Sequence, residues 1–219
     1  MENDQLILNP TFDSPDREQE LAILFLDIRN FTGLLEAQAG QTVIQVVRRL
    51  FTAFNQIVKN FGGKVVEIAG DSLYAVFGLQ SELKESVNNA YQASKVMFQT
   101  VKLFNDAYAE PYYGGPLQIG VGLHAGKVFV GEFGLDNTPQ LSVTGLPVNI
   151  ASRLQAKTKE LNNDMIISED AYQLLTENEG ITLHQTVKLQ GISQDQQIRL
   201  AGKPYHTHQE LDYLLAISG

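Results

Sequence analysis

The chain contains 219 residues, of which 43% are hydrophobic and 19% are charged, and it carries a net charge of −9. This composition is typical of a folded globular protein, and the length is enough for one large domain. The negative charge argues against general binding to nucleic acid, which needs clustered basic side chains. No cysteine is present, so disulfides, thiolate metal sites and cysteine nucleophiles are excluded.

The first 20 residues are polar and acidic, and they lack the basic and then apolar pattern of a secretory signal. No apolar run approaches the ~20 residues that are needed to span a bilayer. The sequence therefore predicts a cytoplasmic protein without an integral membrane segment.

Regular patterning starts at residue 21, where a short apolar run ends abruptly at Asp27, as a buried strand does. Two β-rich runs are later joined through Gly70-Asp71, which is hairpin spacing with glycine where a positive φ is easiest. The elements expected in the first half are, in chain order, strand 21–25, helix 41–61, strands 64–68 and 72–77, and helix 81–105.

The second half continues with mixed strand and helix signals. Pro147 lies in the first turn of a helical pattern, where its missing N–H costs nothing. Ser168 is placed to cap a short helix. The elements expected here are strands 117–123 and 128–133, separated by residues 124–127; helix 147–161; strand 165–167; helix 169–175; and strands near 182–189 and 195–200.

This order of elements predicts an α+β fold, namely a ferredoxin-like βαββαβ core with additional strands and helices, in which helices cover an antiparallel sheet. No repeat, low-complexity segment or linker divides the chain. We expect one domain over residues 21–203, between an N-terminal tail of residues 1–20 and a C-terminal extension of residues 204–219.

Two carboxylates lie at the ends of expected strands, Asp27 after the first strand and Asp71 in the hairpin turn. In a ferredoxin-like sheet the first strand lies beside this hairpin, so the two groups can meet at one edge. Adjacent carboxylates without a basic partner repel each other unless divalent cations lie between them, as in sites for phosphoryl transfer. The alternative is that Asp27 caps a helix and Asp71 fills a tight turn.

A polar pair marks the third expected helix. Asn149 and Arg153 are four residues apart and project from one helix face, while Val148, Ala151 and Leu154 are expected to face the core. An amide beside a guanidinium suits a ribose and a developing negative charge on phosphate. A solvated polar face explains the same spacing.

Four segments resemble, in order and at family spacing, the motifs of class III adenylate/guanylate nucleotide cyclases, over about residues 20–200. They are Phe25-Leu26-Asp27-Ile28 with Phe31-Thr32 for the first metal motif, Gly70-Asp71-Ser72 to Gly78 for the second, Gly122-Leu123-His124-Ala125-Gly126 with Val130-Gly131 for the central hairpin, and Gly145 with residues 148–154 for the transition-state helix. Each motif alone is weak, but the set of four in order is highly specific.

The resemblance implies a nucleotide cyclase of the single-domain bacterial type that uses two Mg²⁺ or Mn²⁺ ions per site. Asp27 and Asp71, helped by the carbonyl of Ile28, would hold the ions. The ribose 3′-hydroxyl of a nucleoside triphosphate would attack the α-phosphorus in line, and pyrophosphate would leave. The β- and γ-phosphates would bind to the backbone at the next helix start, at Asn30, Phe31 and Thr32.

The resemblance also implies a homodimer. Asn149 would orient the ribose and Arg153 would stabilise charge on the α-phosphate. In this family the metal aspartates and the Asn/Arg pair of one site come from different chains, so two copies would form two composite sites. Gln190 replaces the family's usual phosphate-binding lysine, and Lys188 is the candidate to substitute for it.

Glu67 and Ser142 stand at the positions where the family reads the base. Guanylate cyclases carry glutamate at the first position, and a carboxylate accepts from the N1–H and amino group of guanine. Glutamate can also accept from the amino group of cytosine or the N3–H of uracil. Departures from the common family pattern, such as Gln190, resemble the divergent pyrimidine cyclases of bacterial anti-phage defence. We rank GTP first, CTP or UTP second and ATP third. An exposed strand residue is the alternative for Glu67, and a silent cyclase-like dimerisation domain is the alternative for the whole chain.

Overall fold

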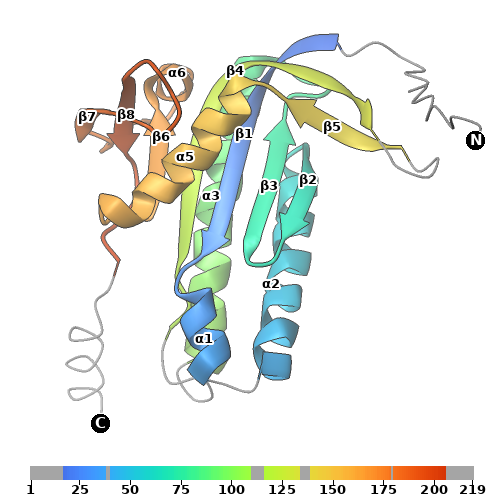
Figure 1. Cartoon of the computed structure of the whole chain (residues 1–219), viewed down its shortest axis with the longest axis vertical. Helices are drawn as coiled ribbons and strands as arrows, with labels where there is room; N and C mark the ends of the chain where they lie inside the picture. Colours follow the sequence, from blue (N-terminus) through green and yellow to red (C-terminus); the bar gives the residue numbers. More distant parts are fainter. Residues whose placement is uncertain (1–16, 38–39, 110–115, 134–138, 179, 206–219) are drawn as a thin grey trace, which may run out of the picture.

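The computed structural model describes residues 17–37, 40–109, 116–133, 139–178 and 180–205 (Figure 1). An eight-stranded sheet forms its centre, in the order β2-β3-β1-β4-β6-β8-β7, with β5 paired to β4. The pairing of β4 with β6 is parallel, and the other pairs are antiparallel. The order β2-β3-β1-β4 within it is that of the predicted ferredoxin-like core.

The elements have the following bounds. The strands are β1 (Arg17–Ile28), β2 (Gly63–Ala69), β3 (Ser72–Phe77), β4 (Ile119–Phe133), β5 (Gln140–Thr144), β6 (Met165–Ser168), β7 (His184–Val187) and β8 (Gln196–Leu200). The helices are α1 (Phe31–Ala37), α2 (Gly40–Asn60), α3 (Leu83–Phe104), α5 (Leu146–Glu160) and α6 (Glu169–Tyr172), with a π-helical segment, η1 (Asn105–Ala109), after α3.

The two faces of the sheet pack against different helices, because successive side chains of β1 point to opposite sides. Leu24 and Leu26 belong to the main core cluster, which includes the apolar faces of α2 and α3. Leu21 and Ile23 belong to a second cluster, which includes Ala151 of α5. Figure 1 shows the resulting layers, with α2 and α3 on the far side of the sheet and α5 on the near side.

Gly122 of β4 lets α5 lie directly on the sheet. A Cβ atom at this position would lie 2.3 Å from the backbone nitrogen of Gln155 and 2.6 Å from the carbonyl oxygen of Ala151. These distances leave no room for any side chain, so the backbone of α5 is fixed against β4 at this point.

The structure corrects the expectation of two strands separated by residues 124–127. β4 is one continuous strand, and it pairs with β1 from Ile119 to Val130, with Ile23 opposite His124 and Leu21 opposite Gly126. Gly126 does not serve a turn. Its missing side chain makes room for Pro147, since a Cβ atom at Gly126 would lie 2.8 Å from the Pro147 Cγ.

The ends of the domain also differ from the expected boundaries. β1 begins at Arg17 rather than at residue 21, because residues 17–20 pair with residues 127–130 of β4 although they are polar. β5 was not among the expected strands, and Val143 is its only buried residue. The segment after residue 203 stays in contact with the fold as far as Tyr205, whose N–H donates to Asn162 Oδ1. The rest of the expected tail and extension, residues 1–16 and 206–219, lies outside the described residues.

Among the described residues, no helix combines the length and the apolar character that crossing a bilayer requires.

Candidate active site

The structure brings Asp27 and Asp71 together at one end of the β1–β3 ladder. Asp27 is paired with Ser72, the first residue of β3, and Asp71 immediately precedes it. The N–H of Ile28 donates to the carbonyl oxygen of Asp71 at 3.1 Å, and the Ser72 hydroxyl donates to Asp27 Oδ2 at 2.8 Å. The two aspartates therefore occupy one edge of the sheet, as the predicted topology requires.

Asp27 differs from the expected carboxylate in having a basic partner. Arg29 donates through Nη2 to Asp27 Oδ1. Burial raises the pKa of the Asp27 carboxyl, while the Arg29 guanidinium and the Ser72 hydroxyl lower that pKa and the charge of Asp71 raises it further. Arg29 lies in the turn that follows β1, where its N–H donates to the carbonyl oxygen of Gln118 at 2.8 Å. Strand alternation therefore does not place this pair, and the sequence reasoning missed it.

The start of α1 follows directly on this edge. Asn30 has a positive φ of 54°, and its carbonyl oxygen accepts a hydrogen bond from Leu34 N–H at 3.0 Å. Asn30 and Thr32 are exposed, while Phe31 is half-buried and packs against the main core. The three predicted phosphate-binding residues therefore follow Asp27 closely in the sequence, with two of them open to solvent.

Asn149 and Arg153 both lie on the exposed side of α5, while Ala151 and Leu154 are fully buried. Val148 is only half-buried, and Ile150 is a core residue that the sequence did not single out. In the part of the chain that the structure describes, no hydrogen bond or ion pair joins Asn149 or Arg153 to either aspartate. The structure thus keeps the predicted pair on one helix face and separate from the aspartates of its own chain.

The predicted base-reading residues flank Tyr74. Glu67 is exposed on β2, beyond a bulge between Val65 and Glu67, and it is paired with Tyr74 of β3. The Tyr74 hydroxyl donates to the carbonyl oxygen of Val143 at 3.2 Å, next to the half-buried Ser142 on β5. Burial, and to a lesser extent the charge of Glu67, raises the pKa of Tyr74. Tyr74 therefore links the strand pair that carries Glu67 to the strand that carries Ser142.

Lys188 is exposed immediately after β7, at the opposite edge of the sheet from β2. The structure does not bring it to Asp27 or Asp71 within one chain.

Two contacts near the site were missed by the sequence reasoning. Phe25 stacks on Tyr74 with ring centroids 4.6 Å apart, on the same side of β1 as Asp27. Tyr205 lies under the Arg29 guanidinium, with its ring centroid 6.0 Å from Cζ. The first could have been found from the alternation of β1 and its pairing with β3. The second joins segments far apart in the sequence and leaves no local signal.

Comparison with known proteins defines the class of protein to which the chain belongs. The family model described as the adenylate and guanylate cyclase catalytic domain matches residues 14–208. The chain belongs to this family, and the class III resemblance seen in its motifs is confirmed.

Individual relatives agree with this assignment. An adenylate cyclase of Anabaena cylindrica is 27% identical over 179 residues, which is 79% of this chain and 35% of that protein. The chain thus spans about a third of the length of the curated relatives that it matches.

Solved structures confirm the α+β cyclase fold. The guanylyl cyclase Cya2 superposes with a TM-score of 0.78 at 20% identity, covering 89% of this chain and 98% of that one. The adenylyl cyclase CyaB from P. aeruginosa gives a TM-score of 0.75 at 22% identity, covering 90% and 99%.

Proposed function

We propose that the protein converts a nucleoside triphosphate, with GTP preferred, to a 3′,5′-cyclic nucleotide and pyrophosphate at sites shared by two copies of the chain. The observation that carries the proposal is the division of the predicted residues. Asp27 and Asp71 lie at one sheet edge, while Asn149 and Arg153 face outward from α5.

The sheet edge fits a site for divalent cations. Class III cyclases generally use such ions, and the donors here are two carboxylates and the backbone carbonyl of Ile28, which are hard oxygen ligands of the kind that Mg²⁺ and Mn²⁺ prefer. The described residues contain no cluster of three or more His, Cys, Asp or Glu that could hold a metal by itself. Two bound cations would neutralise the triphosphate and lower the pKa of the ribose 3′-hydroxyl.

The remaining residues bind and orient the substrate. The backbone at Asn30, Phe31 and Thr32 would hold the β- and γ-phosphates. Asn149 would position the ribose so that its 3′-oxygen is in line with the α-phosphorus, and Arg153 would stabilise the charge that develops on the α-phosphate. Lys188, which is exposed after the outermost strand β7, would help to bind the phosphates of the nucleotide.

A second copy of the chain supplies what one copy lacks. Because Asn149 and Arg153 make no contact with the aspartates of their own chain within the described residues, a complete site needs the α5 face of a partner beside the β1–β3 edge. A twofold dimer repeats this arrangement and gives two equivalent sites.

Glu67 supports GTP as the preferred substrate. Its carboxylate is exposed and accepts hydrogen bonds only, which matches the N1–H and amino group of guanine and opposes N1 of adenine. The same carboxylate can accept from the amino group of cytosine or the N3–H of uracil, so CTP and UTP form the second candidate.

The test is turnover of purified protein with GTP, ATP, CTP or UTP supplied separately with Mn²⁺, and with products resolved by mass and retention time. Cyclic GMP as the main product supports the proposal, and cyclic CMP or UMP moves the protein to the pyrimidine cyclases and to a role in anti-phage defence. No product from a folded dimer with any of the four would instead favour a silent dimerisation or signalling domain.

A further inference from the structure

Arg29 is a mostly buried cation at the metal edge, which is the end of the β1–β3 ladder that carries Asp27 and Asp71. Only 16% of its side chain is exposed, and the one ion pair it makes in the described part of the chain is with Asp27. Its Nε has no hydrogen-bond partner among the described residues. The guanidinium is therefore tied to the fold mainly through Asp27 Oδ1.

Arg29 fits a gap that Gly120 leaves in β4. A Cβ atom at Gly120 would lie 3.2 Å from Arg29 Cζ, 2.6 Å from the Tyr205 hydroxyl and 2.5 Å from Thr158 Oγ1. The absence of a side chain on Gly120 thus lets Arg29 and Tyr205 come together beside Asp27. The Tyr205 ring lies 6.0 Å from Arg29 Cζ, within reach of a cation–π contact.

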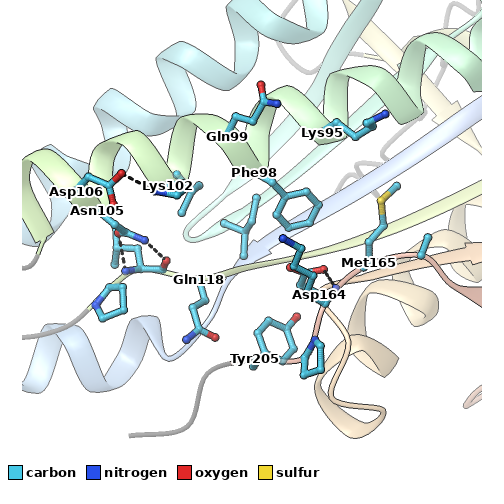
Figure 2. A pocket seen from close by; sticks show the side chains of 18 of the residues that line it. Lys95, Phe98, Gln99, Lys102, Asn105, Asp106, Gln118, Asp164, Met165 and Tyr205 are labelled. Carbon is cyan, nitrogen blue, oxygen red and sulfur yellow. Dashed lines mark hydrogen bonds and ion pairs between the residues drawn. The ribbon is translucent and has the colours of Figure 1, made fainter. Parts of the chain in front are cut away.

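Tyr205 is held independently of Arg29. Its N–H donates to Asn162 Oδ1 at 3.0 Å, and the N–H of Lys203 donates to Asp164 Oδ1 at 2.7 Å. Figure 2 shows Tyr205 near Asp164 and Gln118 on the wall of a cavity of about 710 Å³ between α3, β4 and β6. The main chain of Tyr205 is therefore fixed beside Arg29, which places its ring where the guanidinium can remain when it leaves Asp27.

Both oxygens of Asp27 already have donors, Arg29 on Oδ1 and Ser72 on Oδ2. Each oxygen keeps a second lone pair for a divalent cation, but a cation bound to this carboxylate repels the guanidinium on Oδ1. The Ser72 hydroxyl is uncharged and can keep its hydrogen bond to Oδ2. Arg29 is therefore the donor that charge repulsion displaces.

We propose that Arg29 is a displaceable counter-ion of Asp27, which neutralises the carboxylate without a cation and, when a divalent cation binds, leaves the carboxylate but stays over the Tyr205 ring. Arg29 and Tyr205 are positioning residues for the metal edge. Arg29 lowers its affinity for a divalent cation, and Tyr205 raises that affinity. This inference rests on the proposed role of Asp27 as a metal ligand.

The experiment measures Mn²⁺ binding to the full chain without nucleotide, from the loss of the electron paramagnetic resonance signal of free Mn²⁺. Removing the charge in Arg29→Gln is expected to tighten binding about fivefold, as expected for removal of a competing ion pair. Arg29→Lys, which keeps a charge, is the matched control and should bind within about twofold of the original protein. In Asp27→Asn the binding should be lost, with or without Arg29→Gln.

A second pair of variants keeps the test decisive if Arg29→Gln folds poorly. Tyr205→Leu removes the resting surface and should weaken Mn²⁺ binding about threefold, while Tyr205→Phe keeps the ring and should leave it unchanged. Unchanged or weaker binding in a folded Arg29→Gln protein, or equal binding by the Leu and Phe variants of Tyr205, overturns the counter-ion role alone. Undiminished binding in Asp27→Asn overturns both this role and the proposed metal site.

Discussion

The N–H of Ile28 donates to the carbonyl oxygen of Asp71 at 3.1 Å, and this hydrogen bond joins the end of β1 to the turn before β3. It fixes the backbone next to Asp27 and the backbone of Asp71 to each other. The positions of the two carboxylates therefore follow from the strand pairing and do not depend on a long flexible loop, which is the geometry that a preorganised cation site needs.

Replacing either carboxylate should abolish metal-dependent turnover. We expect Asp27→Asn and Asp71→Asn each to reduce the turnover number at least about 100-fold, because each removes a charged ligand from cations that stabilise the transition state. The measurement is the steady-state rate with saturating nucleotide and Mn²⁺. Circular dichroism and the unfolding midpoint serve as controls for the fold, and full activity in both variants would contradict the two-cation assignment.

The proposed sharing of each site between two chains predicts complementation. Asp71→Asn and Arg153→Ala should each be inactive alone, but an equal mixture should recover about one quarter of the original activity, because half of randomly formed dimers are mixed and each has one intact site of two. The measurement is activity after mixing and equilibration of the purified variants. Mixed dimers that form, as seen by affinity tagging of one chain, but stay inactive would count against shared sites.

The features of the predicted site geometry that the structure reproduces are those fixed by local pattern and strand order. Asp27 and Asp71 come together because a ferredoxin-like order places β1 beside β3, and Asn149 and Arg153 share a face because they are four residues apart on a helix. The ion pair between Asp27 and Arg29 was not predicted, because Arg29 lies in the turn after β1, where the two-residue period of a strand no longer holds.

The parts that the sequence did not predict depend on contacts between distant segments. The run from His124 to Lys127 looks like a turn, yet it stays extended because β1 pairs along it and Pro147 packs against Gly126. Tyr205 lies beyond the expected end of the domain, and its place beside Arg29 follows from the hydrogen bond to Asn162. Neither contact has a signature in the residues next to it.

The close packing of α5 on Gly122 predicts that a single methyl group added at Gly122 lowers stability strongly. Gly122→Ala should lower the free energy of unfolding by about 2 kcal/mol or more, because the new Cβ would meet backbone atoms that cannot rotate away. Displacement of α5 should also reduce activity, since this helix carries Asn149 and Arg153. The measurement is urea unfolding together with turnover.

The matched control is Gly40→Ala at the start of α2, where the nearest atom to a new Cβ is Leu35 Cδ2 at 4.0 Å. This variant should stay within about 0.5 kcal/mol of the original stability. Equal stability of the two alanine variants would show that α5 can move away from β4 at little cost.

His124 predicts a loss of stability at acidic pH. It is buried on β4, its Nδ1 lies 2.8 Å from Ser168 Oγ, and burial lowers its pKa from 6.5 to about 4. The unfolded chain therefore binds the proton more readily than the folded one. Stability is retained above pH 6.5 and decreases as the pH falls towards 4, by a total of about 3 kcal/mol.

The measurement for His124 is the unfolding free energy between pH 7.5 and about pH 4, compared with that of His124→Gln. The glutamine variant cannot take up this proton, so its stability should fall less steeply over the same range. His184→Gln is the comparison variant, because it removes a histidine that is exposed on β7, 3.8 Å from Glu169, and not one that is buried in the core. The same slope in the His124 variant and the original protein would assign the acid sensitivity to other groups.

Exchange of the base-reading residues should redirect the substrate preference. In Glu67→Lys combined with Ser142→Asp, a donor replaces the acceptor on β2 and an acceptor is added on β5, which suits N1 and the amino group of adenine. Both positions flank Tyr74, whose hydroxyl holds β5 through Val143, so the exchange leaves that hydrogen bond in place. We expect the ratio of kcat/KM for ATP over GTP to rise about 10- to 100-fold, measured with both nucleotides in one competition assay.

The control for this exchange is Tyr74→Phe, which removes the hydroxyl without changing Glu67 or Ser142. It should lower turnover with both nucleotides alike. A ratio that moved in Tyr74→Phe but not in the double variant would place base recognition elsewhere.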